Sequence, residues 1–285
     1  MTGIAARPTV LVGVGGTGWS GAVRWAAEEA ARRAATLRLV RVLRPWQDRR
    51  GADAELAAAA RAATAAAPGT PIERAVVPGS PVRSLIAGSG TADLLVVGSR
   101  RRRGPAPAGH LLPALDRSAH CPIVVVPEPY PHPDPELPVV VGVDGSAGDE
   151  PAIEFAFEAA AARDAVLIAV HTWLEHVVDD SPAALRGWEL IAEEEHAALD
   201  ARLARPAADR PDVVVDRICR CTSATRLLVE LSRRAQLVVI GSHGHGRIAG
   251  HMVDAAAHGL ARSAGCPWVV VRTVRSPATS GASLR

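Results

Sequence analysis

Two short loops in the second half of the sequence combine a carboxylate with closely spaced glycines. The first is Asp144-Gly-Ser146, and the second runs from Gly241 to Gly246 with the sequence GSHGHG. Glycines leave backbone amides open to a phosphate group, and a helix that follows adds the positive end of its dipole. The Asp144 carboxylate can accept a hydrogen bond from a ribose hydroxyl or from an amino group of a base. The loops therefore suit a ligand that carries such groups.

The basic residues exclude two kinds of chemistry. The chain has no lysine, so its 32 basic residues are all arginine. A Walker A loop needs a lysine on the β and γ phosphates, and enzymes that form a Schiff base need an amine nucleophile. We also find no arrangement of a nucleophile and a base. A protein without enzymatic activity is therefore expected.

The elements that must position these loops occur twice along the chain. Three segments of the first half return in the second: 9–18 as 138–146, 92–100 as 235–243, and 120–126 as 265–271. A period of roughly 130 to 145 residues is the size of a domain and too long for a solenoid repeat. The chain is therefore predicted to contain a duplicated domain.

Each half alternates short apolar runs with alanine-rich, charged stretches. The predicted strands are Thr9–Val14, Leu37–Leu43, Ile72–Val77, Leu94–Gly98, Ile123–Val126, Val139–Val143, Val166–His171, Val213–Ile218, Leu237–Gly241 and Trp268–Val271. Predicted helices include Gly21–Arg33, Ala52–Ala67, Glu150–Arg163 and Pro182–Ala204. Runs that are apolar throughout indicate parallel strands covered on both faces, and the alternation predicts two α/β domains. Ligands of such sheets bind beyond the carboxyl ends of the strands, where both loops and Thr172 would lie.

A proline-rich segment, Pro127–Pro138, separates the halves. Because proline stands at nearly every second position, the segment is predicted to stay outside the sheet as a stiff, extended spacer. The expected domains are 1–128 and 137–273, followed by a loose tail at 274–285.

The composition indicates where in the cell the protein is expected. No window approaches the roughly 18 apolar residues of a membrane span, and the first residues lack the apolar core of a signal peptide. We therefore expect a cytoplasmic protein with four reduced cysteines and no membrane contact. A net charge of +2 gives no general attraction to nucleic acid.

In these motifs the sequence resembles the universal stress protein family in its tandem-domain form, from about Thr9 to Arg272. The second half carries the resemblance in VGVDGS at 141–146, in 237–246, in Gly250 and in CPWVVV at 266–271. The resemblance implies two five-stranded parallel domains of the adenine nucleotide alpha hydrolase-like type, paired through their last strands as an internal pseudo-dimer. It also implies a non-enzymatic stress response and, in one branch, a bound ATP or other adenine nucleotide, with Mg²⁺ only as part of the nucleotide complex. A homodimer and an unknown protein partner stay open.

The nucleotide-binding branch carries G-x-x-G and, nine residues later, Gly-Ser or Gly-Thr. Here Gly241-x-x-Gly244 is intact, but Asp254-Ala255 stand at the Gly-Ser position. At the start of a helix, Asp254 would repel a negative ligand by on the order of 4 kcal/mol at about 4 Å, unless Arg247 compensates. The candidate ligand-binding residues are Asp144, Gly145, Thr172, Gly241, Ser242, His243, Gly244, Gly246, Asp254 and Ala255.

The first half departs from the family pattern at other positions. Gly15 stands where the second half has Asp144, so the carboxylate is missing. Arg101 replaces the second glycine after Gly98, and Gly109-His110 fall at the Gly-Ser position. We expect no nucleotide site of the family type in this half.

Two other functions stay open. The sequence GVGGTG from Gly13 to Gly18 fits G-x-G-x-x-G after a strand, and Arg44 could meet a 2′-phosphate, as in an NADP-binding oxidoreductase. The other alternative is a protein-interaction module that binds no nucleotide.

Several further side chains could do chemistry, and each also has a structural explanation. The histidines at 243, 245, 251 and 258 match no metal-ligand spacing, so no metal site is expected. Cys219 and Cys221 share a strand face and could sense redox state, but ordinary thiols are favoured. The cluster Arg100–Arg103 is interpreted as a solvated loop, and Cys121 and Cys266 as packing residues.

Overall fold

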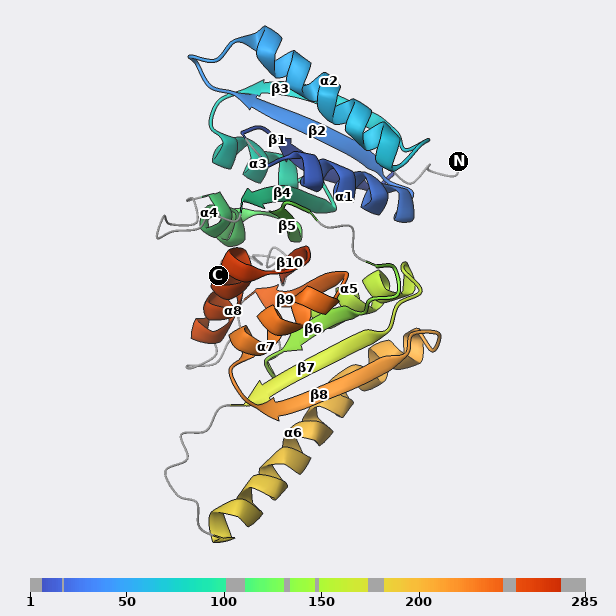
Figure 1. Cartoon of the computed structure of the whole chain (residues 1–285), viewed down its shortest axis with the longest axis vertical. Coiled ribbons are helices and arrows are strands. Elements are labelled where there is room, and N and C mark those ends of the chain that lie inside the picture. The colour runs from blue at the N-terminus through green and yellow to red at the C-terminus, as the bar shows by residue number, and fades with distance from the viewer. Residues whose placement is uncertain are drawn as a thin grey trace, which may run out of the picture.

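The computed structural model describes residues 7–16, 18–100, 111–130, 134–146, 149–173, 182–242 and 250–272 of the 285-residue chain, with the backbone alone at 100, 182–189 and 250–254. Figure 1 shows the first half of the chain above the second, with the long helix α6 at the lower end. No helix in these ranges is both long and apolar enough to span a lipid bilayer.

Ten strands form one sheet across both halves, in the order β3-β2-β1-β4-β5-β10-β9-β6-β7-β8. All neighbouring strands are parallel except β5 and β10, which pair antiparallel at the junction. The predicted α/β fold, with five parallel strands in each half joined through their last strands, is therefore confirmed. The strands are β1 (Thr9–Val14), β2 (Thr36–Leu43), β3 (Ile72–Pro78), β4 (Leu94–Arg100), β5 (Ile123–Glu128), β6 (Val139–Val143), β7 (Leu167–Trp173), β8 (Val215–Cys221), β9 (Leu237–Ser242) and β10 (Trp268–Arg272).

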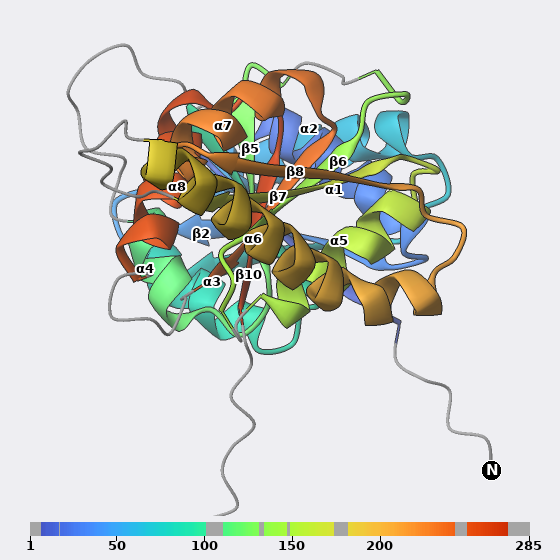
Figure 2. The same cartoon turned by 90° about the horizontal axis from the view of Figure 1, so that it is seen from below.

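Helices cover both faces of the sheet, as Figures 1 and 2 show. One face packs against α1 (Ser20–Arg32), α2 (Arg49–Ala66), α5 (Glu150–Ala161) and α6 (Pro182–Asp209). The other packs against α3 (Pro81–Ser89), α4 (Leu111–Ser118), α7 (Ala224–Leu231) and α8 (Gly250–Ser263). Successive side chains of β1 enter opposite layers, Val10 and Val12 in one core and Leu11 in the other. This arrangement explains why the strand sequences are apolar throughout.

The start of the proline-rich segment differs from the prediction. Pro127 and Glu128 belong to β5 and pair with Ser99 and Arg100 of β4. On its other side β5 pairs with β10 only from Ile123 to Val125, so Pro127 lies beyond that ladder. A proline is tolerated at such a strand end because no second neighbour needs its missing N–H.

The far end of the same segment is attached to the second half. The side-chain nitrogen of Gln236, the residue before β9, donates to the carbonyl oxygens of Pro135 and Leu137 at 2.7 and 2.6 Å. The backbone N–H of Gln236 donates to the carbonyl of Pro138 at 2.9 Å. The chain therefore enters β6 from a fixed position.

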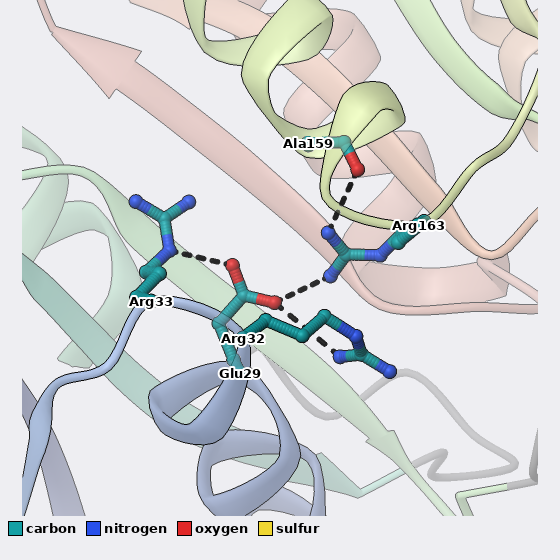
Figure 3. A network of polar contacts seen from close by, with 5 residues as sticks. All are labelled: Glu29, Arg32, Arg33, Ala159 and Arg163. Atoms are coloured by element: carbon teal, nitrogen blue, oxygen red, sulfur yellow. Dashed lines mark hydrogen bonds and ion pairs between the residues drawn. The ribbon is translucent and has the colours of Figure 1, made fainter.

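A buried ion-pair network joins the halves beside the sheet (Figure 3). Glu29 of α1 is 1% exposed and accepts hydrogen bonds from Arg33 Nε and Arg163 Nη2, both at 2.6 Å. Arg32 lies 3.5 Å from the same carboxylate, and Arg163 also donates to the carbonyl of Ala159 at 3.0 Å. Burial acts to raise the pKa of Glu29, but the guanidinium groups of Arg163, Arg33 and Arg32 outweigh it and lower that pKa. Glu29 therefore stays ionised inside the junction.

Candidate functional site

Three of the predicted site residues meet at the carboxyl ends of adjacent strands. Asp144 follows β6, Gly241 is near the end of β9, and Thr172 lies in β7 on the other side of β6. All three line one pocket, whose other walls are Gly142, Val143, Asp149, Val170, Ala224, Leu228, Ile240 and Ala256. Its volume is about 40 Å³, well below the roughly 300 Å³ of a complete small-molecule site. The described part of the pocket therefore admits one edge of a planar group.

The carboxylate of Asp144 is the polar group in this pocket with an oxygen that the described residues leave unsatisfied. Its Oδ1 accepts a hydrogen bond from the backbone N–H of Ser146 at 2.8 Å. Its Oδ2 is buried and has no hydrogen-bond partner among the described residues. Leaving a buried acceptor unsatisfied costs about 1 to 3 kcal/mol, so this oxygen is suited to a donor that a ligand supplies.

Asp149 holds the Asp144 loop from behind. It is 3% exposed, and its Oδ2 accepts from the N–H groups of Asp144 at 3.1 Å and Gly145 at 2.8 Å. Burial, then the negative charge of Asp144 and a side-chain hydrogen bond between the two carboxyl groups, raise the pKa of Asp149 to about 7. The sequence offered one signal for this residue, since an aspartate directly before a helix is a common N-cap. Its side chain instead turns back to the preceding loop.

Helix α6 fixes the same loop from the side. His171 Nδ1 lies 2.8 Å from the carbonyl of Val143, and its Nε2 lies 2.8 Å from Glu195 Oε2. Because a carbonyl only accepts, Nδ1 carries a hydrogen. Arg202 donates to the carbonyl of Ser146 at 2.6 Å and also to that of Gly145. The loop is therefore held in one conformation before any ligand binds.

In the first half, an arginine makes the contact with a helix that His171 makes in the second half. Arg41 pairs with Val14 in the strand register, as His171 pairs with Val143. Arg41 Nε donates to Glu55 Oε2 of α2 at 2.5 Å, which mirrors the contact between His171 and α6. The permanently charged arginine thus takes the place of histidine.

The remaining predicted residues are placed differently. Gly145 has a φ of +86°, which favours glycine, and Ser242 is buried. His243, Gly244 and Gly246 lie outside the described residues, as do Arg247, Arg101–Arg103 and Gly109-His110. Helix α8 begins at Gly250, so Asp254 and Ala255 lie in its second turn. Their amides can bond within the helix, unlike the open amides that the sequence pattern suggests. Ala255 is exposed, whereas Ala256 lines the pocket.

The dinucleotide alternative meets a steric and electrostatic obstacle. A dinucleotide would place its pyrophosphate at the start of α1. There the N–H of Gly21 already donates to Glu128 Oε1 at 2.6 Å. A β-carbon on Gly21 would lie only 2.7 Å from that oxygen, so the carboxylate occupies the helix end closely.

The cysteines behave as packing residues where they are buried. Cys121 and Cys266 are 4% and 2% exposed, which confirms their predicted role. Burial raises the pKa of Cys121 to about 12, and burial with the charge of Glu195 raises that of Cys219 to about 11. A protonated thiol is a poor redox nucleophile, which weighs against redox sensing at Cys219. Within the described ranges, no three His, Cys, Asp or Glu side chains group as metal ligands.

Comparison with known proteins gives consistent matches. The family model described as "Universal stress protein family" matches residues 7–127 and 137–272. A universal stress protein of Mycolicibacterium smegmatis is 33% identical over 285 aligned residues, 92% of this chain and 96% of that protein. One from Mycobacterium tuberculosis is 36% identical over 191 residues, 65% of this chain and 60% of that relative's length.

Solved structures include one with a similar fold over nearly the whole chain. A universal stress protein from Archaeoglobus fulgidus has a TM-score of 0.64 at 15% identity, over 93% of this chain and 96% of that one. A shorter universal stress protein, solved in complex with cAMP, is 34% identical and covers 43% of this chain and 98% of its own, with a TM-score of 0.36.

Proposed function

The chain belongs to the universal stress protein family, and we propose that it is a non-enzymatic, cytoplasmic stress-response protein whose second half binds an adenine nucleotide as a regulatory ligand. The observation that carries this proposal is the buried Oδ2 of Asp144, which has no hydrogen-bond partner among the described residues and lies in a mostly apolar pocket. Adenine presents an amino group on its Watson–Crick edge, and this group donates hydrogen bonds. A carboxylate oxygen without a partner is the matching acceptor.

The shape of the pocket supports the entry of a base edge. Val143, Val170, Leu228 and Ile240 form its apolar walls, and Gly241 adds no side chain. Apolar walls suit the faces of a purine, while the small volume leaves the ribose and phosphates outside. The fixed loop lowers the ordering cost of binding, because its carbonyl and amide groups are already held by Arg202 and Asp149.

The local charge sets the preferred number of phosphates. The Asp144 carboxylate lines the pocket, and Asp254 stands where the family's nucleotide-binding branch has glycine. Each added phosphate brings negative charge toward an acidic site, which is unfavourable. We expect adenosine and AMP to bind more tightly than ATP.

The test is isothermal titration of the full chain with adenosine, AMP, ATP and inosine monophosphate. Inosine monophosphate replaces the amino group of adenine with a carbonyl oxygen, which would face the Asp144 carboxylate. We expect AMP to bind at least about tenfold more tightly than inosine monophosphate. Asp144→Asn should reduce the ratio of the AMP affinity to the inosine monophosphate affinity, because the asparagine amide can both donate and accept a hydrogen bond.

A matched control separates this effect from a loss of charge. Asp216→Asn removes an exposed carboxylate from β8, outside the pocket, and should leave both affinities unchanged. If no nucleotide gives saturable heat, the nucleotide proposal fails and the protein-interaction alternative gains. Equal affinities for AMP and inosine monophosphate would remove the role assigned to Asp144.

A further inference from the structure

The first half contains a larger cavity than the second, although its sequence lacks the family's nucleotide motif. Its volume is about 570 Å³, within the range of roughly 300 to 1,000 Å³ typical of small-molecule sites. It lies at the carboxyl ends of β1, β2 and β4, where Gly15, Arg41, Arg44, Gln47 and Ser80 are among its lining residues. None of the described residues that line it is acidic.

The two cavities have opposite hydrogen-bonding character at equivalent positions. In the second half, Asp144 presents an unpaired acceptor. In the first half the equivalent residue is Gly15, and a β-carbon placed there would lie 3.1 Å from Arg41 Nη1. A guanidinium, which only donates, therefore lies beside the place where the other half has a carboxylate. The first cavity is built to receive an acceptor.

Arg41 is held in place by hydrogen bonds, and both Arg41 and Arg44 have N–H groups left to donate to a ligand. Arg41 uses Nε on Glu55 and Nη1 on the carbonyl of Val42 at 2.6 Å, and its Nη2 has no hydrogen-bond partner among the described residues. Arg44 is exposed, and its guanidinium lies 5.7 Å from the ring centroid of Trp46. Within the described part of the chain, Arg44 forms no side-chain hydrogen bond or ion pair. The guanidinium groups of Arg41 and Arg44 thus line one cavity, and Glu55 is the only carboxylate among the described residues that pairs with either of them.

We propose that this cavity binds a small organic anion whose carboxylate or phosphate oxygens accept hydrogen bonds from Arg41 and Arg44. The apolar part of the ligand packs along Val40, Val42 and Leu85, which line the same cavity. Its volume exceeds the space that an inorganic ion needs. The proposal concerns the first half alone and does not depend on nucleotide binding in the second.

The test is isothermal titration of the full chain with citrate, ribose 5-phosphate and sodium sulfate at matched ionic strength. Citrate and ribose 5-phosphate distinguish a carboxylate ligand from a phosphate ligand. We expect at least one of them to bind more tightly than sulfate. Arg44→Ala should weaken that binding about tenfold or more, since it removes charge-assisted hydrogen bonds.

Two further variants make the result specific. Arg220→Ala removes an exposed arginine from β8, far along the sheet order, and should leave the affinity unchanged. Glu55→Gln keeps an acceptor for Arg41 but removes the opposing charge, so it should tighten binding severalfold, a gain that misfolding cannot produce. Asp144→Asn should have no effect. Absence of saturable heat with both organic anions, equal binding of sulfate, or equal losses in Arg44→Ala and Arg220→Ala would overturn the proposal.

Discussion

Asp149 is the group in the second-half pocket whose protonation changes near neutral pH. It is almost fully buried, and burial together with the neighbouring Asp144 charge raises its pKa to about 7 from an ordinary value of 3.8. Its Oδ2 still accepts two backbone hydrogen bonds from the loop. The protonated form is therefore the one that the folded structure favours below neutral pH.

The resulting pH dependence can be measured. Because the pKa is higher in the folded state, Asp149 contributes stability that is fully present below about pH 4 and is lost as pH rises through about 7. Asp149→Asn mimics the protonated form and removes this dependence. The difference in unfolding free energy between the variant and the parent, from urea unfolding, should shift in favour of the variant by on the order of 2 to 4 kcal/mol between pH 4 and pH 8. A constant difference across that range would contradict the assignment, and Asp216→Asn serves as the control.

The positions of Asp144, Gly241 and Thr172 around one pocket could be anticipated because each lies at the end of a recognisable strand. Those of Glu195 and Arg202 could not. Helix α6 contains three consecutive glutamates, Glu193 to Glu195, and only its packing against the loop decides which one meets His171. Side-chain partners across such a distance depend on how the helix is rotated and shifted, and a single sequence does not contain that information.

The strands were predicted more closely than the helix ends. The largest difference among strand ends is at β8, predicted to end at Ile218 and observed to end at Cys221. Edge strands such as β8 are half-exposed, so their ends lack the apolar contrast that marks a buried strand. Helix α6 continues to Asp209 through Pro206, beyond its predicted end at Ala204.

The close approach of β4 to the glycine turn of the first half gives a stability prediction. A β-carbon on Gly98 would lie 2.0 Å from the carbonyl oxygen of Gly18, so Gly98→Ala must displace backbone. We expect a loss of about 2 to 4 kcal/mol in unfolding free energy. Gly51→Ala, in the first turn of α2 with nothing within 4 Å, should instead be neutral or gain up to about 1 kcal/mol. Similar changes in unfolding free energy in both variants would contradict the close approach of Gly98 to the Gly18 carbonyl.

The junction between the halves combines a backbone ladder with a charged contact. Three residue pairs join β5 to β10, and Arg163 reaches Glu29 beside them. Arg33 makes a second contact between the halves, because its guanidinium lies 5.0 Å from the ring centroid of Phe155 in α5. Arg33 directly follows α1, and Arg163 comes two residues after the end of α5, the first helix of the second half. The halves should therefore unfold together.

Removing the buried member of this network should be costly. Arg163→Ala leaves the Glu29 carboxylate buried with fewer partners, and we expect a loss of about 3 to 5 kcal/mol. The matched control is Arg210→Ala, which breaks an exposed pair with Glu158 and should cost less than about 1 kcal/mol. Chemical denaturation of both variants, followed by tryptophan fluorescence, makes the comparison. Comparable losses would show that the junction does not use the ion pair.

One polypeptide supplies both β5 and β10, and this has a consequence for how the protein can vary. When two identical chains pair, dilution separates them and every mutation appears on both sides. Here the pairing is intramolecular, so it does not depend on protein concentration. A change in one half leaves the other half untouched. At equivalent positions, Gly15 lies beside the Arg41 guanidinium in the first half, whereas Asp144 supplies a carboxylate in the second. Two identical chains in a symmetric homodimer could not differ in this way.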